Sequence, residues 1–314
     1  MTENTQAASE PSSGWRVWWR LARPFSLTAS IVPVLVGTGV ALGTRTFHAP
    51  DLLITMLLGS VLIQIATNMF NEYYDYKHGL DTPETVGIAG AIVRGLVPAI
   101  DVFKAAIVCF VLALALGLYI VGRSAPEVFL VGLACALGGY LYTGGPLPIA
   151  YTPFGEIEVF VFMGPIIVGL ASFIQARVVT PSAVWASLPV GCLVAAILLA
   201  NNLRDIVADG RIGRHTVPVV LGRRAGLVVY ATLLSGAFVT PPLAVVLGFL
   251  PITALLPLIT IPAPFHLVQL YRSTDAPRSL DAGVRGSAGL HARFGLLLAL
   301  GVSLGATIGW RPPG

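Results

Sequence analysis

The stretch from Ser182 to Asp209, "SAVWASLPVGCLVAAILLANNLRDIVAD", combines the two features that decide the fold. Most of it is apolar over the roughly 20 residues that an α-helix needs to cross a bilayer core of about 30 Å. It then turns polar at Asn201, Asp205 and Asp209, which follow one another at i+4 and share one stripe of a helix. The stretch therefore predicts a membrane-spanning helix with a polar site at one end.

The rest of the 314-residue chain has the same apolar character. Hydrophobic residues make up 55% of it and charged residues only 11%, whereas a soluble domain has about 25% charged residues. This composition excludes a soluble globular protein. The apolar runs are continuous rather than alternating from residue to residue, which favours α-helices over a membrane β-barrel. We therefore predict an all-α, polytopic transmembrane helical bundle with a central apolar cavity and a cytoplasmic polar cap.

Apolar runs of membrane-spanning length predict about nine helices. They lie at residues 25–44, 52–74, 99–121, 126–144, 156–175, 182–203, 225–245, 248–270 and 290–309. The break between the seventh and the eighth is the least sharply marked, and we place it near Pro241, Pro242 and Gly248. Residues 1–14 are polar and lack the positively charged start of a signal peptide, so we expect a disordered N-terminal tail before a single transmembrane domain at 15–314.

The basic residues predict the orientation of the bundle. With loops on alternating sides, 15 of the 19 Lys and Arg residues fall on the side of the N-terminus and 4 on the other. Because cytoplasmic loops are enriched in Lys and Arg, we expect the N-terminus in the cytoplasm. The larger connections, at 75–98, 204–224 and 271–289, then lie on the same side, where we expect the active site. No contiguous basic patch forms, so the expected environment is a lipid bilayer and no nucleic acid is expected to bind.

A second polar cluster ends the run at 52–74, in the motif "NMFNEYYDYKHGLD". Asn68, Asn71 and Asp75 stand at i, i+3 and i+7 and so share one stripe of the predicted helix. The glycine near the end of the motif is expected to stop the helix and let the chain fold back, which would bring Asp81 near Asp75. Both clusters contain Asn-x-x-x-Asp, a weak indication of two related halves.

Carboxylates and amides at the ends of membrane helices are costly unless they are paired, and the helix dipole repels anions there. A cation held between the two clusters would offset both effects. Carboxylate and amide oxygens suit Mg²⁺, with Mn²⁺ possible, and Mg²⁺ is usually completed by water and substrate phosphates. The two clusters therefore predict a metal–diphosphate site. We interpret Glu84, Asp275 and Asp281 as solvated loop residues outside it.

Basic and aromatic residues lie between the acidic motifs. We expect basic side chains to bind phosphate oxygens, with positive-inside topology as the alternative explanation; they are Lys77, Arg94, Arg204 and Arg214. The connection "YLYTGGPLPIAYTPFGE" at 140–156 supplies Tyr142, Tyr151 and Glu156. Its aromatic faces are either interfacial anchors or a means of stabilising a cation. A polar head site at the edge of an apolar bundle suits a polyprenyl diphosphate, whose ionisation would leave an allylic cation for an aromatic acceptor to attack.

Three motifs together are similar to the UbiA superfamily of intramembrane prenyltransferases. They are "NNLRDIVADGRIGRHTVPVVLG" at 201–222, "YTGGPLPIAYTPFGE" at 142–156, and the spacing of Asn71, Asp75 and Asp81. The sequence most resembles the menaquinone-type 1,4-dihydroxy-2-naphthoate polyprenyltransferases, from "LARPFSLTASIVPVLVGT" to the last helix. This resemblance implies Mg²⁺-dependent transfer of a polyprenyl chain to the naphthoate, with loss of CO₂ and diphosphate, in a prokaryotic cell membrane.

The residue patterns and the resemblance together give the expected site. The catalytic residues are Asp75, Asp205, Asp209 and Tyr142. The metal ligands are Asn71, Asp75, Asp81, Asn201, Asp205 and Asp209. The substrate-binding residues are Asn68, Asn71, Lys77, Arg94, Asn201, Asn202, Arg204, Arg214, Tyr151 and Glu156.

Three departures from the family pattern leave the acceptor open. Glu72 stands where Asp is common, Phe25 where Lys is frequent, and Arg214 where Lys is usual. The alternative is a prenyltransferase of the same superfamily that acts on 4-hydroxybenzoate, homogentisate or a natural-product phenol. A cation-coupled transporter is a more distant alternative, because transporter sites lie near the bilayer midplane whereas these acids lie at helix ends.

Overall fold

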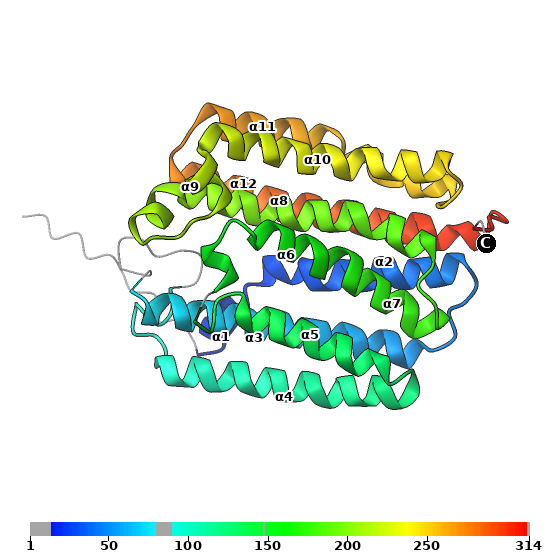
Figure 1. Cartoon of the computed structure of the whole chain (residues 1–314), viewed down its shortest axis with the longest axis horizontal. Coiled ribbons are helices and arrows are strands. Elements are labelled where there is room, and N and C mark those ends of the chain that lie inside the picture. The colour runs from blue at the N-terminus through cyan, green and yellow to red at the C-terminus, as the bar shows by residue number, and fades with distance from the viewer. Residues whose placement is uncertain (1–13, 80–89, 147, 313–314) are drawn as a thin grey trace, which may run out of the picture.

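The computed structural model describes residues 14–79, 90–146 and 148–312, and all regular structure in these ranges is helical. The long helices run side by side along one axis (Figure 1). The elements are α1 (Gly14–Ala22), η1 (Pro24–Leu27), α2 (Thr28–Gly43), α3 (Pro50–Lys77), α4 (Ala99–Arg123), α5 (Glu127–Leu141), η2 (Ile149–Tyr151), α6 (Gly155–Val161), η3 (Phe162–Ile166), α7 (Ile167–Ala176), α8 (Pro181–Arg211), α9 (Val217–Leu221), α10 (Arg223–Val246), η4 (Ile252–Thr260), α11 (Pro262–Ser273), α12 (Pro277–Ser303) and η5 (Leu304–Ala306).

The predicted all-α membrane fold is confirmed. Within the described ranges, eight helical stretches are long and apolar enough to cross a membrane: Pro24–Gly43, Pro50–Lys77, Ala99–Arg123, Gly155–Ala176, Pro181–Arg211, Arg223–Val246, Ile252–Ser273 and Pro277–Ala306. The one remaining expected helix, at 126–144, corresponds to α5, which has only 15 residues and is shorter than the other eight. Each of the nine predicted runs therefore corresponds to a helical segment.

One predicted boundary is wrong. The expected connection at 271–289 is mostly helix, because α12 already begins at Pro277 and only residues 274–276 separate it from α11. The first turns of α12 bury Leu280, Val284 and Ser287 at i, i+4 and i+7, but they contain too many polar residues to form an apolar run. The predicted break between the seventh and the eighth helix is confirmed at Gly248, where φ is +82°; Pro241 and Pro242 lie inside α10, which ends at Val246.

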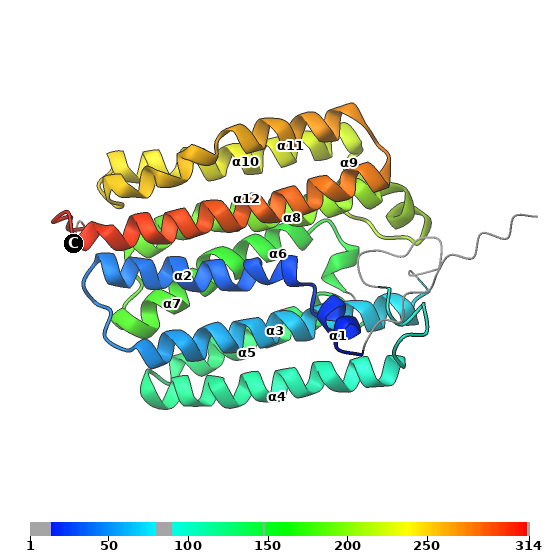
Figure 2. The ribbon, with the colours of Figure 1, turned by 180° about the vertical axis from the view of Figure 1, so that it is seen from behind.

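Helix α1 is a short amphipathic helix that we did not predict. Its Val17 and Leu21 are buried against α3, whereas Trp15 and Trp19 are exposed. Figure 2 shows α1 beside the start of α2, at the end of the bundle where α3 ends. Exposed tryptophans beside a transmembrane bundle are typical of the membrane–water interface.

The centre of the bundle is α8, which packs against α6, α10 and α12. The approach of α8 to α6 and η3 requires glycine: a Cβ on Gly191 would lie 2.7 Å from the carbonyl oxygen of Phe160. Small residues at such crossings let membrane helices pack backbone against backbone. The widened π-turn of η3 contains Pro165, which removes one backbone donor. These contacts fix the positions of α6 and α8, the two helices that flank the site described next.

Candidate functional site

Both acidic motifs lie at the carboxyl ends of long helices, as predicted. Helix α3 ends at Lys77 and is followed by Gly79 with φ of +70°, while α8 ends at Arg211 and is followed by Gly213 with φ of +77°. Figure 1 shows the ends of α3 and α8 at the same end of the bundle, together with α9 and opposite the end of α12. The two motifs therefore face one polar region. Asp81 lies outside the described residues.

Arg214 joins the two motifs. Its Nη2 lies 2.7 Å from Oδ1 of Asp75 on α3, and its Nη1 lies 3.4 Å from Oδ1 of Asp209 on α8. Burial alone would lower the pKa of the Arg214 guanidinium, but the carboxylates of Asp75 and Asp209 raise it above its usual value. The sequence predicted a cation between the two acidic clusters. In this structure the guanidinium of Arg214 occupies that position.

Tyr151 forms the floor beneath Arg214. The guanidinium carbon lies 4.8 Å from the centre of the Tyr151 ring, within range of a cation–π interaction. Burial raises the pKa of the Tyr151 hydroxyl, and within residues 14–79, 90–146 and 148–312 this buried hydroxyl has no hydrogen-bond partner. The backbone N–H of His215 donates to the Tyr151 carbonyl at 2.9 Å. The 140–156 connection is thus anchored to the chain after α8, and it offers an unused hydroxyl donor beside the acids.

Arg204 organises a second group of charges. Its guanidinium binds both carboxylate oxygens of Asp205, at 2.8 and 2.6 Å, and the Asn201 side-chain oxygen at 2.8 Å. It also binds Asp281 of α12 at 3.0 Å. Our interpretation of Asp281 as a solvated loop residue is therefore wrong, because the early start of α12 brings it onto a helix beside α8. Asp281 is a candidate site residue that the sequence spacing did not reveal.

The connection between α5 and α6 contacts both motifs through side chains. Thr143 donates a hydrogen bond to Oδ1 of Asn71 at 2.7 Å. Asn202 donates to Oε1 of Glu156 at 2.9 Å, and both of these side chains are buried. Glu156 and Asn202, which we predicted to bind substrate, thus bind each other, while Oε2 of Glu156 has no partner among the described residues. This pair fixes the start of α6 against α8.

Two polar residues of the α3 motif hold chain segments in place. Asn68 donates to the Ala22 carbonyl and to Oγ of Ser26, both at 2.9 Å. Glu72 is 1% exposed and accepts the backbone N–H of Ala91 at 2.6 Å. These contacts secure the link from α1 to α2 and the chain that enters α4. Of the motif residues within the described ranges, Asn71 and Asp75 are left to face α8.

Two of the predicted phosphate-binding residues lie apart from the Arg214 group. Lys77 is exposed, and its ammonium nitrogen lies 5.9 Å from the centre of the Tyr73 ring. Arg94 is exposed in the turn that precedes α4. The structure therefore forms two charged groups at this end of the bundle, one around Arg214 and one around Arg204. Within the described part of the chain, Lys77 and Arg94 belong to neither group.

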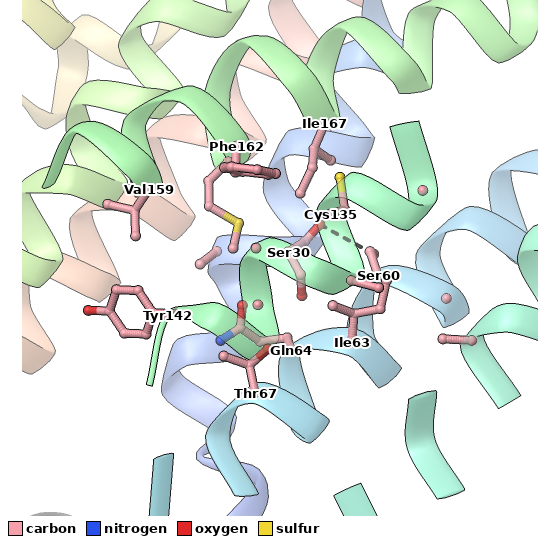
Figure 3. A pocket seen from close by; sticks show the side chains of 18 of the residues that line it. Ser30, Ser60, Ile63, Gln64, Thr67, Cys135, Tyr142, Val159, Phe162 and Ile167 are labelled. Carbon is pink, nitrogen blue, oxygen red and sulfur yellow. Dashed lines mark hydrogen bonds between the residues drawn. The ribbon is translucent and has the colours of Figure 1, made fainter. Parts of the chain in front are cut away.

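An apolar cavity of about 380 Å³ lies beneath the polar network (Figure 3). Its lining includes Asn71 and Asn201 from the two motifs and also Tyr142. Along α3 the lining extends from Met56 to Asn71, about 22 Å at 1.5 Å per residue. Apolar side chains from α2 to α8 form most of the wall, so the predicted central apolar cavity is confirmed. Gly132 also lines it and would present a Cβ to open space.

The residues of the polar region fit a divalent cation, although the described part of the chain brings no three His, Cys, Asp or Glu side chains together as ligands. Four carboxylates, those of Asp75, Asp205, Asp209 and Asp281, pair with the three guanidinium groups of Arg204, Arg214 and Arg285. Among these groups the negative charge is in excess by one. Within the described ranges, Oδ2 of Asp209 is buried without a partner. An all-oxygen set with surplus negative charge suits Mg²⁺ or Mn²⁺.

Comparison with known proteins gives a consistent set of relatives. Residues 30–283 match the model of the UbiA prenyltransferase family. A 1,4-dihydroxy-2-naphthoate octaprenyltransferase of Bacillus subtilis is 38% identical over 299 residues, which cover 95% of each chain. A protein of the same name from Mycobacterium tuberculosis is 35% identical over 220 residues, covering 70% of this chain and 75% of the relative.

Solved structures share the fold at low sequence identity. A UbiA homolog from Archaeoglobus fulgidus bound to DMAPP and Mg²⁺ has a TM-score of 0.63 and 17% identity, covering 90% of this chain and 99% of the homolog. An apo UbiA homolog from Aeropyrum pernix has a TM-score of 0.67 and 16% identity, covering 88% and 96%. The helical arrangement described above is thus shared with both.

Proposed function

Because this chain belongs to the UbiA prenyltransferase family, we propose that it transfers a polyprenyl chain from polyprenyl diphosphate to 1,4-dihydroxy-2-naphthoate. The reaction releases CO₂ and diphosphate and gives demethylmenaquinone. The observation that carries the proposal is the joining of a polar network and an apolar cavity through Asn71 and Asn201. One site thereby accommodates a charged head and a hydrocarbon tail. The names of the Bacillus and Mycobacterium relatives support the naphthoate as acceptor.

The diphosphate head binds at the ends of α3 and α8. Asn71, Asp75, Asp81, Asn201, Asp205 and Asp209 would hold Mg²⁺, which when bound neutralises the diphosphate and makes it a better leaving group. Arg204 and Arg214 now bind these carboxylates, and the same guanidinium groups can turn to phosphate oxygens when a metal takes the acids. The buried Tyr151 hydroxyl can donate to a phosphate oxygen as well.

The hydrocarbon tail binds in the apolar cavity. Burial of apolar surface there stabilises the tail by about 25 cal/mol per Å². Tyr142 lies in the cavity wall near the motifs, where its ring faces the carbon that becomes an allylic cation when diphosphate leaves. The apolar wall also keeps water away from this carbon, so that the aromatic acceptor rather than water attacks it.

The proposed site lies on the cytoplasmic side of a prokaryotic cell membrane. The N-terminus shares this side. Counting from α2, α3 is the second span and α8 the sixth, so both run back to the side from which the chain starts. The excess of Lys and Arg at this end supports the orientation. A cysteine introduced at exposed Arg94 should react with an impermeant thiol reagent in inverted vesicles and not in intact cells. Labelling in intact cells would reverse the orientation.

A panel of acceptors tests the reaction. Purified protein in proteoliposomes, with Mg²⁺ and one polyprenyl diphosphate, is given 1,4-dihydroxy-2-naphthoate, 4-hydroxybenzoate or homogentisate. We expect prenylated product and CO₂ with the naphthoate, loss of activity with a chelator, and recovery on adding Mg²⁺. Product formed only from 4-hydroxybenzoate or homogentisate would contradict the proposed acceptor.

A further inference from the structure

Glu158 is a carboxylate within a membrane-length helical stretch that none of the roles above uses. It lies in α6, two residues after Glu156, so the two side chains leave the helix in nearly opposite directions. Glu156 faces α8 and binds Asn202, whereas Glu158 lines the apolar cavity. Among the residues that the structure describes, Oε2 of Glu158 is buried and finds no hydrogen-bond partner. An ionisable group in such a position is costly and usually serves a function.

The cavity contains a second acceptor without a partner. Gln64 of α3 lines the wall, and its Nε2 donates to Asn68 at 3.4 Å. Its Oε1 is buried and has no partner in the described part of the chain. Figure 3 shows Gln64 across the cavity from Val159 and Phe162, the residues that share the lining face of Glu158. Two unsatisfied acceptors thus face one cavity from α3 and from α6.

Both acceptors line the cavity in which prenyl transfer would occur. Tyr142 and Asn71 belong to the same lining. A ligand in this cavity would therefore have Tyr142 in its wall and the polar network, through Asn71, at one end. Gln64 Oε1 and the ionised Glu158 Oε2 can only accept hydrogen bonds, and a protonated Glu158 can donate one. The complementary ligand therefore carries hydroxyl groups, which can donate and accept.

We propose that Glu158, assisted by Gln64, binds the ring hydroxyl groups of the aromatic acceptor and selects a dihydroxy acceptor over its ethers. The proposal rests on the proposed function and adds the residues that recognise the acceptor. A hydrogen bond from a hydroxyl to a carboxylate also directs electron density into the ring, which favours attack on an allylic cation. A site that hydrogen-bonds a substrate hydroxyl rejects an analogue lacking it, because the buried acceptor is then left unpaired.

Binding measurements with paired ligands test this role. The wild type and E158L are titrated with 1,4-dihydroxy-2-naphthoate and with 1,4-dimethoxy-2-naphthoate, without prenyl diphosphate. We expect the wild type to prefer the diol by roughly 10- to 100-fold and E158L to bind both ligands alike. The control is E127Q, since Glu127 is exposed at the start of α5 and does not itself line the cavity. Retention of the diol preference in E158L would overturn the proposal.

Kinetics separate acceptor recognition from general damage. In E158L the KM for the naphthoate should rise roughly 10- to 100-fold while the KM for polyprenyl diphosphate stays unchanged. An equal rise in both KM values would show a structural role and overturn the proposal. If E158L does not fold, E158Q replaces a charged acceptor by a neutral one, and its diol preference should fall about fivefold; an unchanged preference would count against Glu158.

The two proposals fail differently. A wild type that binds the diol preferentially yet forms no product from the naphthoate would refute the proposed reaction and leave the recognition role standing. A wild type that forms product, with E158L keeping the diol preference, would refute only the role of Glu158.

Discussion

The two acidic motifs have similar sequences but are held in the structure by different means. In the α3 motif, Asn68 and Glu72 bind backbone groups of other segments, at Ala22 and Ala91. In the α8 motif, the acids bind arginine side chains, and further charge comes from α12. In the α3 motif, Asp75 also binds Arg214, and Glu72 lies 3.5 Å from Arg23. The α3 motif therefore combines ion pairs with hydrogen bonds to backbone groups, whereas the acids of α8 are held by arginine side chains. Substitutions at the backbone-bound residues of α3 should affect stability more than metal binding.

The largest effect is expected where the motifs are alike. D75N and D205N each remove one charge from the proposed metal clamp while keeping the size of the side chain. We expect turnover to fall about 10²- to 10³-fold in both, with little change in melting temperature. The control is D101N, because Asp101 is exposed at the start of α4. Full activity in either site variant would mean that the clamp lies elsewhere.

The next effect concerns Arg214, the side chain that links the motifs. R214A leaves Asp75 and Asp209 partly buried and unpaired, so we expect a loss of stability together with about a 10- to 100-fold loss of turnover. R214K keeps the charge but not the two-sided contact, and it should recover part of both. Melting curves recorded with and without Mg²⁺ provide the measurement, and Mg²⁺ should stabilise R214A more than the wild type. If Mg²⁺ raised the melting temperature of R214A and of the wild type equally, Arg214 would not be part of the metal site.

A stability effect without a metal effect is expected for Glu72. E72A leaves the Ala91 N–H buried without its acceptor, which should cost about 1–3 kcal/mol of stability. E72Q keeps an oxygen acceptor and should cost less. Thermal unfolding in detergent checks the stability, and the Mg²⁺ concentration for half-maximal activity should be the same in both variants. A large rise in that concentration would place Glu72 in the metal site.

The smallest effect is expected for Asp281. D281N keeps an oxygen for Arg204 but removes a charge that is partly exposed, and such pairs contribute only about 0–1 kcal/mol. We expect a two- to fivefold loss of turnover, measured at saturating Mg²⁺. A loss as large as that of D205N would make Asp281 an equal member of the clamp.

The parts of the site that depend on local spacing could be predicted from sequence. Asn201, Asp205 and Asp209 share a stripe because i+4 spacing fixes their directions on any helix. The charge relation of Arg204 to Asp281 could not be predicted, since it joins residues 77 positions apart. The structural role of Glu72 could not be predicted either. It accepts a hydrogen bond from the backbone N–H of Ala91, and nearly every residue has such a group, so the sequence does not indicate which one it binds.

Glu158 is an intermediate case. An acid inside the predicted span at 156–175 was visible in the sequence and marks function by default. Its direction, however, depends on how α6 packs on α8 through Gly191. Only that packing turns Glu156 toward Asn202 and Glu158 toward the cavity.

The short helix α5 ends at a deeper level of the bundle than α3 does. Thr143, just past its end, binds Asn71, and α3 continues to Lys77, about 9 Å farther along its axis. With only 15 residues, α5 is shorter than the thickness of a typical bilayer core, so the lipid beside it would have to thin to match it. The thickness of the host bilayer then becomes a variable that acts on the site through α5.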